Sequence, residues 1–354
     1  IFVFVNYSSE TVEDEGVYKL GTVQALTGEG AVYGEKIQRV IEAAVEDLNM
    51  QWEDKGMKLK IYPEDGKCNP KDALTAIQNL VNFKGVNVIY GGTCSGETLG
   101  MAPFAGDNEV IIFSTSSSSP EITNAGDFIF RDYPSDTAQV SAISHHIMQE
   151  GYENVAIMSE NTDYAQALRQ GYLDLFENVV ADEIINPETK DVRTEMLKIK
   201  NANPDVVILL PQTIPMAGIF AKQWVETGMR VAGYGNEILS LGDTLKDYGT
   251  ELEGFYTPRV KFAGEGNEAF QELIERTECD LDYFCATAYD GIFMLGEIFE
   301  KCGSEDTACI KDALYATQGW DGPIASGYSF DENGDVSGNF EILQIQDGEL
   351  VVMA

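Results

Sequence analysis

Apolar runs rich in β-branched residues alternate with segments of helical period over most of this 354-residue chain. Several of the runs are continuously apolar, as in parallel strands that are covered on both faces. Alternation of this kind predicts a doubly wound α/β fold. The predicted strands span residues 17–26, 57–62, 86–92, 110–114, 154–160, 205–211 and 230–235, and helices are predicted at 35–50, 70–83 and 215–228.

The strand–helix pattern runs twice along the chain, over residues 17–133 and 136–258, and residues 128–139 separate the two runs. Because one domain usually holds about 100–200 residues, the length predicts two domains. After about residue 260 the regular alternation of predicted strands and helices ends. Helices such as 285–303 lead into a sequence that alternates and turns like antiparallel hairpins.

Acidic residues outnumber basic residues by 59 to 23, which gives the chain a formal charge of −36. A surface of this sign repels nucleic-acid phosphates and anionic lipid headgroups. We therefore expect no nucleic-acid partner. Because the charge is spread along the chain, we favour a heavily solvated surface, suited to a salty or extracellular setting, over a specific cationic partner.

The first sixteen residues, IFVFVNYSSETVEDEG, differ in character from the rest. Their short apolar start resembles the end of the apolar region of a secretory signal, and the polar, acidic remainder resembles a spacer. No stretch approaches the roughly 20 apolar residues that span a bilayer. We therefore expect a periplasmic or extracellular location, with membrane anchoring through a removed N-terminal segment as an open alternative.

The six cysteines favour disulfides that form in an oxidising compartment. Two close pairs are present, and the other two cysteines stand at the edges of predicted elements. Many connectivities are possible. We favour the pairs Cys68–Cys94, Cys279–Cys285 and Cys302–Cys309. Zinc is the alternative, but the chain has no CxxC, and its only histidines, His145 and His146, are adjacent on what we interpret as an ordinary helix surface.

Polar residues that follow the predicted strands are candidates for a binding site, because ligands of open α/β sheets lie beyond the carboxyl ends of the strands. A helix beginning near Ser95 would attract an anion, and Glu237 would hold an ammonium group. Singly, such residues are usually helix caps, solvated carboxylates or packing groups. Together they offer donors for the carboxylate and an acceptor for the ammonium group of a zwitterionic ligand. The candidates are Tyr33, Ser95, Ser116, Ser117, Ser118, Tyr164, Gln212 and Glu237.

Signatures of enzymes, cofactors and metals are missing from the sequence. It has no GxSxG nucleophile elbow, no GxxxxGK[ST] loop and no GxGxxG fingerprint. Residues 331–335, DENGD, begin like a calcium loop, but Ile342 stands where a bidentate glutamate is required, so we predict a plain turn. We expect a protein that is not an enzyme and that binds no cofactor or metal.

Several segments together resemble the type I periplasmic solute-binding proteins, in the branched-chain amino-acid-binding family of ABC importers. The likeness covers nearly the whole chain from Gly16 onward and is carried by LGTVQALTGEGAVYGEKIQRVIEAAVEDLN, DGKCNPKDALTAIQNLV, VIYGGTCSGETLGMAPFA, IIFSTSSSSPEIT and GPIASGYSFDENGD. It implies two Rossmann-like lobes that are joined by three crossover strands and close on a ligand. The first lobe would hold residues 17–133 and 260–323, the second 134–259 and 324–354, with the spacer 1–16 outside both.

The resemblance also implies which residues contact the charged groups of a ligand. The family's carboxylate contacts fall on Ser95 and on the stretch Ser116, Ser117 and Ser118. Its ammonium contacts fall on Glu237 and on backbone near Ser116. Where family members often carry a small GAT-like sequence, this chain has three serines, which predicts a more polar pocket.

An aromatic wall is implied at Tyr33, Tyr164 and Phe284. Gln212 stands where family members carry a tyrosine of the second lobe, which again predicts a more polar pocket. A disulfide common in the family corresponds to Cys68–Cys94. The two pairs near the C-terminus have no such counterpart and rest on spacing alone.

The function expected from this resemblance is that of an extracytoplasmic substrate-binding protein of an ABC importer. It would bind an amino acid, branched-chain or other, between two closing lobes and then dock, as a monomer, on a membrane permease. The alternative is a ligand-sensing module of the same fold that binds an amide, urea-type or aromatic carboxylate solute.

Overall fold

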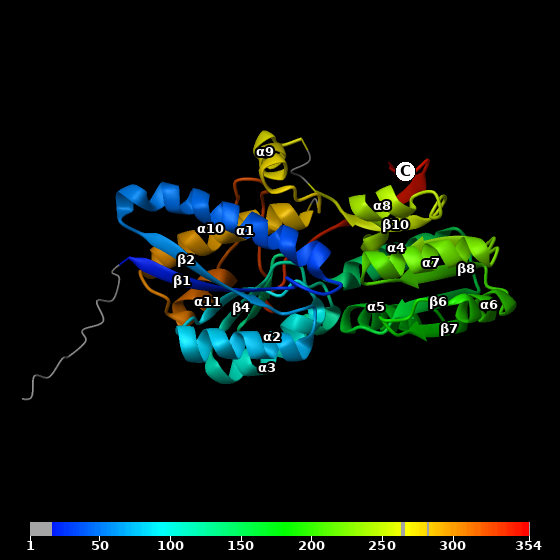
Figure 1. Ribbon diagram of the computed structural model, residues 1–354, viewed down its shortest axis with the longest axis horizontal. Helices are drawn as coiled ribbons and strands as arrows, with labels where there is room; N and C mark the ends of the chain where they lie inside the picture. Colours follow the sequence, from blue (N-terminus) through cyan, green and yellow to red (C-terminus); the bar gives the residue numbers. More distant parts are fainter. Residues whose placement is uncertain (1–15, 263–265, 282, 354) are drawn as a thin grey trace, which may run out of the picture.

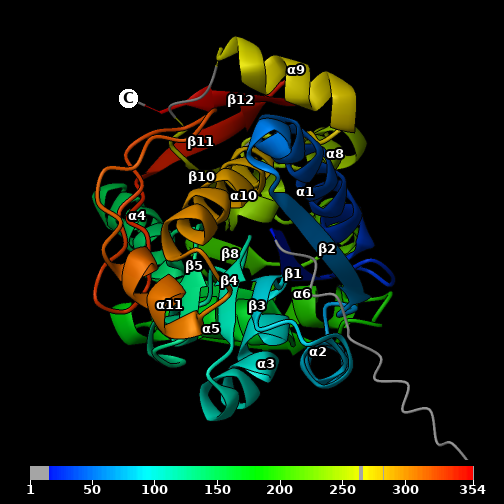
Figure 2. The ribbon, with the colours of Figure 1, turned by 90° about the vertical axis from the view of Figure 1, so that its left-hand side faces the viewer.

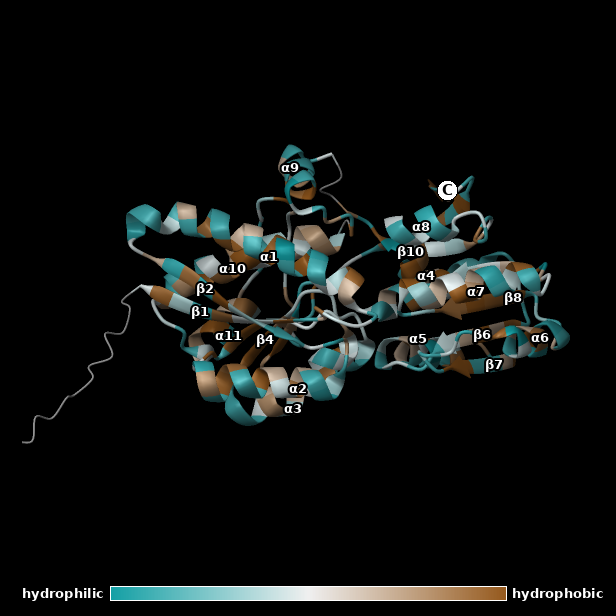
Figure 3. Ribbon diagram, viewed as in Figure 1, coloured by the Kyte–Doolittle hydropathy of each residue, from teal (hydrophilic) through white to brown (hydrophobic). Residues whose placement is uncertain are grey.

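The computed structural model describes residues 16–262, 266–281 and 283–353, so all of the expected N-terminal spacer except Gly16 lies outside the described residues. The chain forms two lobes that lie side by side along the long axis of the molecule (Figure 1). Each lobe has one sheet with helices packed against it (Figure 2). Apolar residues gather on the strands, whereas the outer helices carry polar and apolar residues (Figure 3).

The first lobe contains a sheet of five parallel strands in the order β2-β1-β3-β4-β5. Its elements are β1 (Val17–Gln24), α1 (Ala31–Trp52), β2 (Lys58–Asp65), α2 (Pro70–Asn79), β3 (Val88–Gly91), α3 (Ser95–Asn108), β4 (Ile111–Ser114), β5 (Ile129–Arg131), α9 (Glu268–Thr277), α10 (Tyr283–Cys302) and α11 (Thr307–Tyr315). Val23 and Ile112 pack with α2 and α3, whereas Leu20 and Phe113 belong to the core that contains α1 and α10. Both faces are therefore covered, which explains the continuously apolar strands.

The second lobe contains a sheet of seven strands in the order β12-β11-β10-β9-β8-β6-β7. Its elements are α4 (Asp136–Gln149), β6 (Val155–Glu160), α5 (Asp163–Leu175), β7 (Val179–Ile185), α6 (Arg193–Asn201), β8 (Val206–Leu210), α7 (Ile214–Glu226), β9 (Ala232–Gly235), α8 (Gly242–Tyr248), β10 (Tyr256–Val260), β11 (Phe340–Gln346) and β12 (Glu349–Val352). The strands from β6 to β10 pair in parallel, and β11 and β12 form the predicted antiparallel hairpin. The doubly wound α/β prediction is thus confirmed for both lobes.

The chain crosses between the two lobes three times, after β5, after β10 and before β11 (Figures 1 and 2). The boundary expected from the sequence would assign residues 324–339 to the second lobe. In this segment, however, the Phe330 ring contacts Phe113 of β4, with centroids 5.7 Å apart, and Asp335 pairs with Arg131 of β5 at 2.6 Å. These contacts favour a boundary near residue 339.

All seven strands predicted from the apolar runs are present, as β1, β2, β3, β4, β6, β8 and β9. The sequence analysis missed three further strands. β5 has only three residues, β7 lies at the sheet edge with most of its side chains half-exposed, and β10 contains Pro258 and Arg259. None of these three has a long apolar run, so the pattern that identified the others does not detect them.

Three further sequence predictions have clear outcomes. The structure contains the disulfides Cys68–Cys94, Cys279–Cys285 and Cys302–Cys309, as expected. Residues 331–335 form a turn in which Asp331 accepts backbone N–H groups. His146 is a correction: instead of lying on an ordinary helix surface, its ring is half-buried, 2.7 Å from the hydroxyl of Tyr234 and packed against Tyr256.

None of the described helices is long and apolar enough to cross a membrane. Among the described residues there is also no group of three or more His, Cys, Asp or Glu side chains that is arranged to hold a metal ion.

Candidate functional site

A cavity of about 460 Å³, counted with its open mouth, lies between the two lobes. The carboxyl ends of β3 and β4 from the first lobe, and of β6, β8 and β9 from the second, point at it. This is the position expected for a ligand site in open α/β sheets. The cavity is lined by Tyr33, Ile37, Thr93, Cys94, Ser95, Ser116, Ser118, Tyr164, Gln212, Glu237, Ile238, Leu241, Leu281 and Phe284.

Eight of the nine candidate residues lie together around this cavity: Tyr33, Ser95, Ser116, Ser118, Tyr164, Gln212, Glu237 and Phe284. Ser117 does not line it. Its hydroxyl is fully buried on the protein side, where it lies 3.1 Å from the carbonyl of Gly92 and 2.8 Å from the Thr98 hydroxyl. The side chain of Ser117 therefore supports the loop, and only its neighbours are available to a ligand.

The serine loop after β4 is ordered and buried, although its composition is typical of a flexible linker. The Ser116 hydroxyl donates to the Thr93 carbonyl at 2.8 Å, and the backbone N–H of Ser119 donates to Ser95 Oγ at 3.1 Å. These bonds join the loop to the residues that lead into α3. Ser95 is the first residue of this 14-residue helix, where free N–H groups favour an anion.

Hydrogen-bond directions divide the three serines of the cavity into two kinds. Ser95 accepts a backbone N–H, so its own proton is free to point into the cavity. The Ser116 hydroxyl donates its proton to the Thr93 carbonyl, and the Ser118 hydroxyl lies beside the Asp136 carboxyl group and lowers its pKa. Ser95 is therefore a donor toward a ligand, whereas Ser116 and Ser118 present lone pairs.

Glu237 is a buried carboxylate at the start of a short 3₁₀ helix (Glu237–Ser240) after β9. The hydroxyls of Tyr133 and Tyr164 both donate to it, the latter at 3.3 Å. Burial, together with the nearby charge of Asp136, raises the pKa of Glu237 to about 8. Among the described residues no ion pair is made by Glu237, so it is a strong acceptor for a cationic group.

One side of the cavity is apolar and was missed by the sequence analysis. It is formed by Ile37, Ile238, Leu241 and Leu281 together with the predicted Phe284. Phe284 is fixed by parallel stacking on Tyr133, with centroids 4.4 Å apart. Ile37 lies in a helix that the sequence predicts, but no pattern in the sequence marks it or the other three aliphatic residues as cavity residues.

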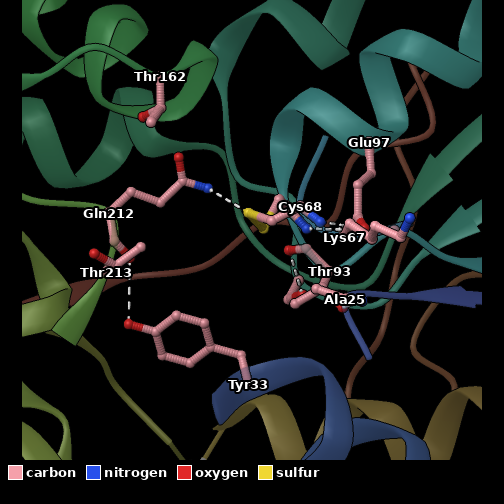
Figure 4. Close-up of a disulfide and its surroundings, with 12 residues drawn as sticks. Ala25, Tyr33, Lys67, Cys68, Thr93, Glu97, Thr162, Gln212 and Thr213 are labelled. Atoms are coloured by element: carbon pink, nitrogen blue, oxygen red, sulfur yellow. Dashed lines mark hydrogen bonds between the residues drawn. A yellow bond between two sulfur atoms is a disulfide. The ribbon is translucent and has the colours of Figure 1, made fainter. Parts of the chain in front are cut away.

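The lobes touch across the mouth of the cavity (Figure 4). The Tyr33 hydroxyl donates to the Gln212 carbonyl at 3.2 Å, and the Gln212 amide lies 3.2 Å from Cys68 Sγ of the first disulfide. Lys36 of α1 contacts Asp243 of α8 at 2.7 Å. Gln212, expected to contact a ligand, thus also connects the lobes.

Comparison with known proteins identifies the family. Residues 17–349 match the family model described as periplasmic binding protein. The chain belongs to this family. Leu/Ile/Val-binding protein homolog 3 of Brucella melitensis is 23% identical over 343 residues, which cover 94% of this chain and 92% of that protein.

Solved structures of solute-binding proteins share the fold of this periplasmic binding protein. The branched-chain amino acid transporter substrate binding protein LivJ of Streptococcus pneumoniae, in complex with isoleucine, has a TM-score of 0.82 at 20% identity, covering 95% of this chain and 100% of that one. A Rhodopseudomonas palustris solute binding protein in complex with benzoate has a TM-score of 0.83 at 18% identity, and 96% of each chain is covered.

Family and fold together show the general role. The chain belongs to a family of extracytoplasmic binding proteins, which are not enzymes. A small-molecule ligand is the partner that such a role implies.

Proposed function

We propose that this periplasmic binding protein captures an α-amino acid with an apolar side chain and presents it to an ABC permease. The observation that carries the proposal is the distribution of chemistry around one cavity. A helix N-terminus with a hydroxyl donor, a buried carboxylate and a set of apolar side chains all line this cavity. These are the three groups that an apolar amino acid requires.

The ligand carboxylate fits the first lobe. Ser95 has a free hydroxyl proton at the N-terminus of α3, and the helix dipole favours a negative charge there. Ser116 and Ser118 offer lone pairs instead of protons, so they are not suited to bind the ligand carboxylate. They suit the hydrogens of the ligand's ammonium group instead, which changes the carboxylate role expected for these two serines.

The ligand ammonium fits Glu237. A desolvated carboxylate gains most from a cation, because charge interactions strengthen where water is excluded. Tyr164, which donates to the same carboxylate, comes from α5 and fixes its orientation. Because Glu237 belongs to the second lobe and Ser95 to the first, a zwitterion would stabilise the closed arrangement by bonding both lobes.

The ligand side chain fits the apolar wall. Ile37 and Leu281 come from the first lobe and Ile238 and Leu241 from the second, so closure would enclose the side chain from both sides. Burying apolar surface here contributes about 25 cal/mol for each Å². This wall supports a leucine-like or aromatic side chain, despite the extra polarity that the serine loop brings.

A second candidate is an aromatic carboxylate, since the Rhodopseudomonas neighbour was solved with benzoate and rings line this cavity too. Such a ligand would occupy the carboxylate and apolar sides but would leave Glu237 without a cation. Glu237 would then keep its proton, because burial raises its pKa, and would make no ion pair with the ligand, so the amine-bearing ligand is the better match.

The test is a thermal-shift and calorimetry panel of L-leucine, L-isoleucine, L-valine, L-phenylalanine, benzoate, acetamide and urea. Two half-ligands complete it: 4-methylpentanoate, which lacks the amine of leucine, and 3-methylbutylamine, which lacks its carboxylate. We expect an apolar amino acid to raise the melting temperature most, and each half-ligand to bind at least about tenfold more weakly than leucine. If benzoate or 4-methylpentanoate binds more tightly than every amino acid, our assignment of Glu237 as the residue that binds the ligand ammonium is wrong.

A further inference from the structure

Asp136 is a fully buried carboxylate directly behind the cavity wall. It is the first residue of α4, just after the first crossover, and its backbone N–H donates to the Ser118 carbonyl at 2.8 Å. Its Oδ1 atom accepts a hydrogen bond from the Gln139 amide. Its Oδ2 atom has no hydrogen-bond partner among the described residues. A buried, half-satisfied carboxylate is costly and calls for an explanation.

Asp136 and Glu237 belong to one buried cluster. Gln139 joins them, because its amide N–H₂ binds Asp136 while its carbonyl accepts the backbone N–H of Glu237 at 3.3 Å. The groups that face the two carboxylates or feel their charge are Tyr33, Ser118, Arg131, Tyr133, Gln139, Tyr164 and Tyr172.

The only cation in that set is Arg131, and its hydrogen bonds go elsewhere. The guanidinium binds both carboxylate oxygens of Asp335, at 2.7 and 2.6 Å, the Ser119 carbonyl at 2.8 Å and the Thr123 hydroxyl. It lowers the pKa of Asp136 from a distance without pairing with it. The two buried carboxyl groups, bridged by Gln139, thus have no direct counter-charge among the described residues.

Two neighbouring buried carboxylates cannot both ionise cheaply. Burial raises the pKa of Asp136 to about 7, and burial plus the charge of Asp136 raises the pKa of Glu237. A cation beside Glu237 would allow both carboxyl groups to ionise, because its positive charge offsets the second negative charge of Asp136 and Glu237.

We propose that Asp136 and Glu237 hold a shared proton when the cavity carries no cation, and that an ammonium-bearing ligand expels this proton. The proton passes from the carboxyl pair to the buffer, the ligand keeps its ammonium charge, and no covalent bond forms or breaks. Asp136 acts as a positioning residue: once ionised, it accepts a hydrogen bond from the Ser118 hydroxyl and leaves a Ser118 lone pair for the ammonium. This inference rests on the proposed function.

The consequence is selectivity by charge. The ammonium group of an amino acid stabilises the ionised form of Asp136 and Glu237, whereas a ligand with only a carboxylate leaves the shared proton in place. Binding of the amino acid therefore depends on pH with a definite sign. Affinity should rise by up to about tenfold per pH unit between pH 6 and pH 7, should level off as the pair ionises above about pH 8, and should fall again above about pH 9.5, where the ligand loses its ammonium proton.

The experiment is calorimetry at pH 7 in phosphate and in Tris, whose ionisation enthalpies differ, with L-leucine or whichever amino acid of the panel stabilises the protein most. The difference in apparent enthalpy gives the number of protons released. We expect about half a proton or more for the wild-type protein with the amino acid, and none with benzoate. Amino-acid binding without proton release overturns the shared proton, whereas no binding of any amino acid overturns the proposed function instead.

Variants assign the proton to its residues. Asp136→Asn should reduce proton release at pH 7 at least threefold and flatten the pH profile of affinity. The matched control is Asp132→Asn, since Asp132 is also buried, has one unpartnered oxygen and binds the Tyr90 hydroxyl away from the cavity. Full proton release by Asp136→Asn, or its loss in Asp132→Asn, contradicts the assignment. The wild-type measurement stands even if a variant fails to fold.

Discussion

Neighbouring serines of one loop differ in what they can do, and the difference lies in backbone direction. Ser116 lines the cavity, whereas Ser117 turns into the protein and bonds Gly92 and Thr98. Both were candidates from the sequence, because residue type and position after a strand are the same. The sequence located the loop correctly but not the orientation of its side chains, which depends on φ and ψ at each residue.

Substituting Ser95 and Ser117 should distinguish a serine that binds the ligand from one that stabilises the loop. Ser95→Ala removes the free hydroxyl donor and should weaken amino-acid binding about tenfold, since a hydrogen bond to a charged group contributes about 1.5–3 kcal/mol. Ser117→Ala removes buried bonds on the protein side and should lower the unfolding free energy by about 1–2 kcal/mol with affinity unchanged. Calorimetry and urea unfolding measure the two effects. The reverse pattern would contradict our division of the loop.

Charge at position 237 should matter more than any hydroxyl. Glu237→Gln keeps the shape of the side chain but removes the counter-charge of the ammonium, so affinity should fall at least tenfold, as expected for truncating a buried charge pair worth about 2–5 kcal/mol. Glu97→Gln is the matched control. Glu97 is equally buried but accepts the backbone N–H groups of Cys68 and Cys94, outside the cavity lining. Equal losses in both variants would indicate general damage and not a lost contact.

The apolar wall shows where sequence reasoning stops. The polar candidates were recognisable because a polar residue after an apolar strand is conspicuous. Ile37 lies on a helix face that packs into the core over most of its length, and Leu281 lies between two cysteines. An aliphatic residue looks the same whether it faces the core or a cavity, so only the packing of the lobes distinguishes the two.

At the scale of elements, helix starts were the most predictable feature. A helix was predicted to begin at Pro70, and the side chain of the preceding Asn69 caps it by accepting the N–H groups of Lys71 and Asp72 at 2.9 and 3.3 Å. Such signals are local, so the sequence contains them in full. Strands such as β7 and β10 depend on their neighbours in the sheet, and no local signal announces them.

The cap can be tested directly. Asn69→Ala should lower the unfolding free energy by about 1 kcal/mol, because two N–H groups at the start of α2 lose their acceptor. Lys71→Ala at the same exposed turn is the control and should change the unfolding free energy by less than about 0.5 kcal/mol. Urea unfolding followed by circular dichroism measures both. An unchanged stability of Asn69→Ala would mean that solvent replaces the cap.

At the scale of the whole molecule, closure brings together two bodies of the same sign. Residues 17–131 and 261–339 contain 14 basic and 32 acidic side chains, and residues 132–260 and 340–353 contain 9 and 23. The formal charges are therefore −18 and −14. Ligand binding has to overcome this repulsion whenever it holds the lobes together.

Salt should therefore strengthen ligand binding. Raising the ionic strength from about 0.01 M to about 1 M shortens the screening length from about 30 Å to about 3 Å, so the repulsion between the lobes nearly vanishes. We expect the dissociation constant of the amino acid to fall several-fold over this range. Calorimetry with NaCl, at constant pH, measures it. A dissociation constant that rises with salt would mean that attraction at the mouth outweighs the repulsion.

Ion pairs also attract the lobes to each other. Lys190 of the second lobe lies 3.7 Å from Glu29 of the first, and Lys36 Nζ lies 2.7 Å from Asp243 of the second lobe and 2.5 Å from Asp280 of the first. Lys36→Met removes the cation but keeps most of the stem, so closure then brings two carboxylates together unshielded. We expect weaker amino-acid binding at low salt and a steeper gain on adding salt. Lys55→Met is the control, because Lys55 pairs with Glu300 within the first lobe and should leave both quantities unchanged. If the two variants behave alike, Lys36 has no part in closure, and the repulsion between the lobes is balanced elsewhere.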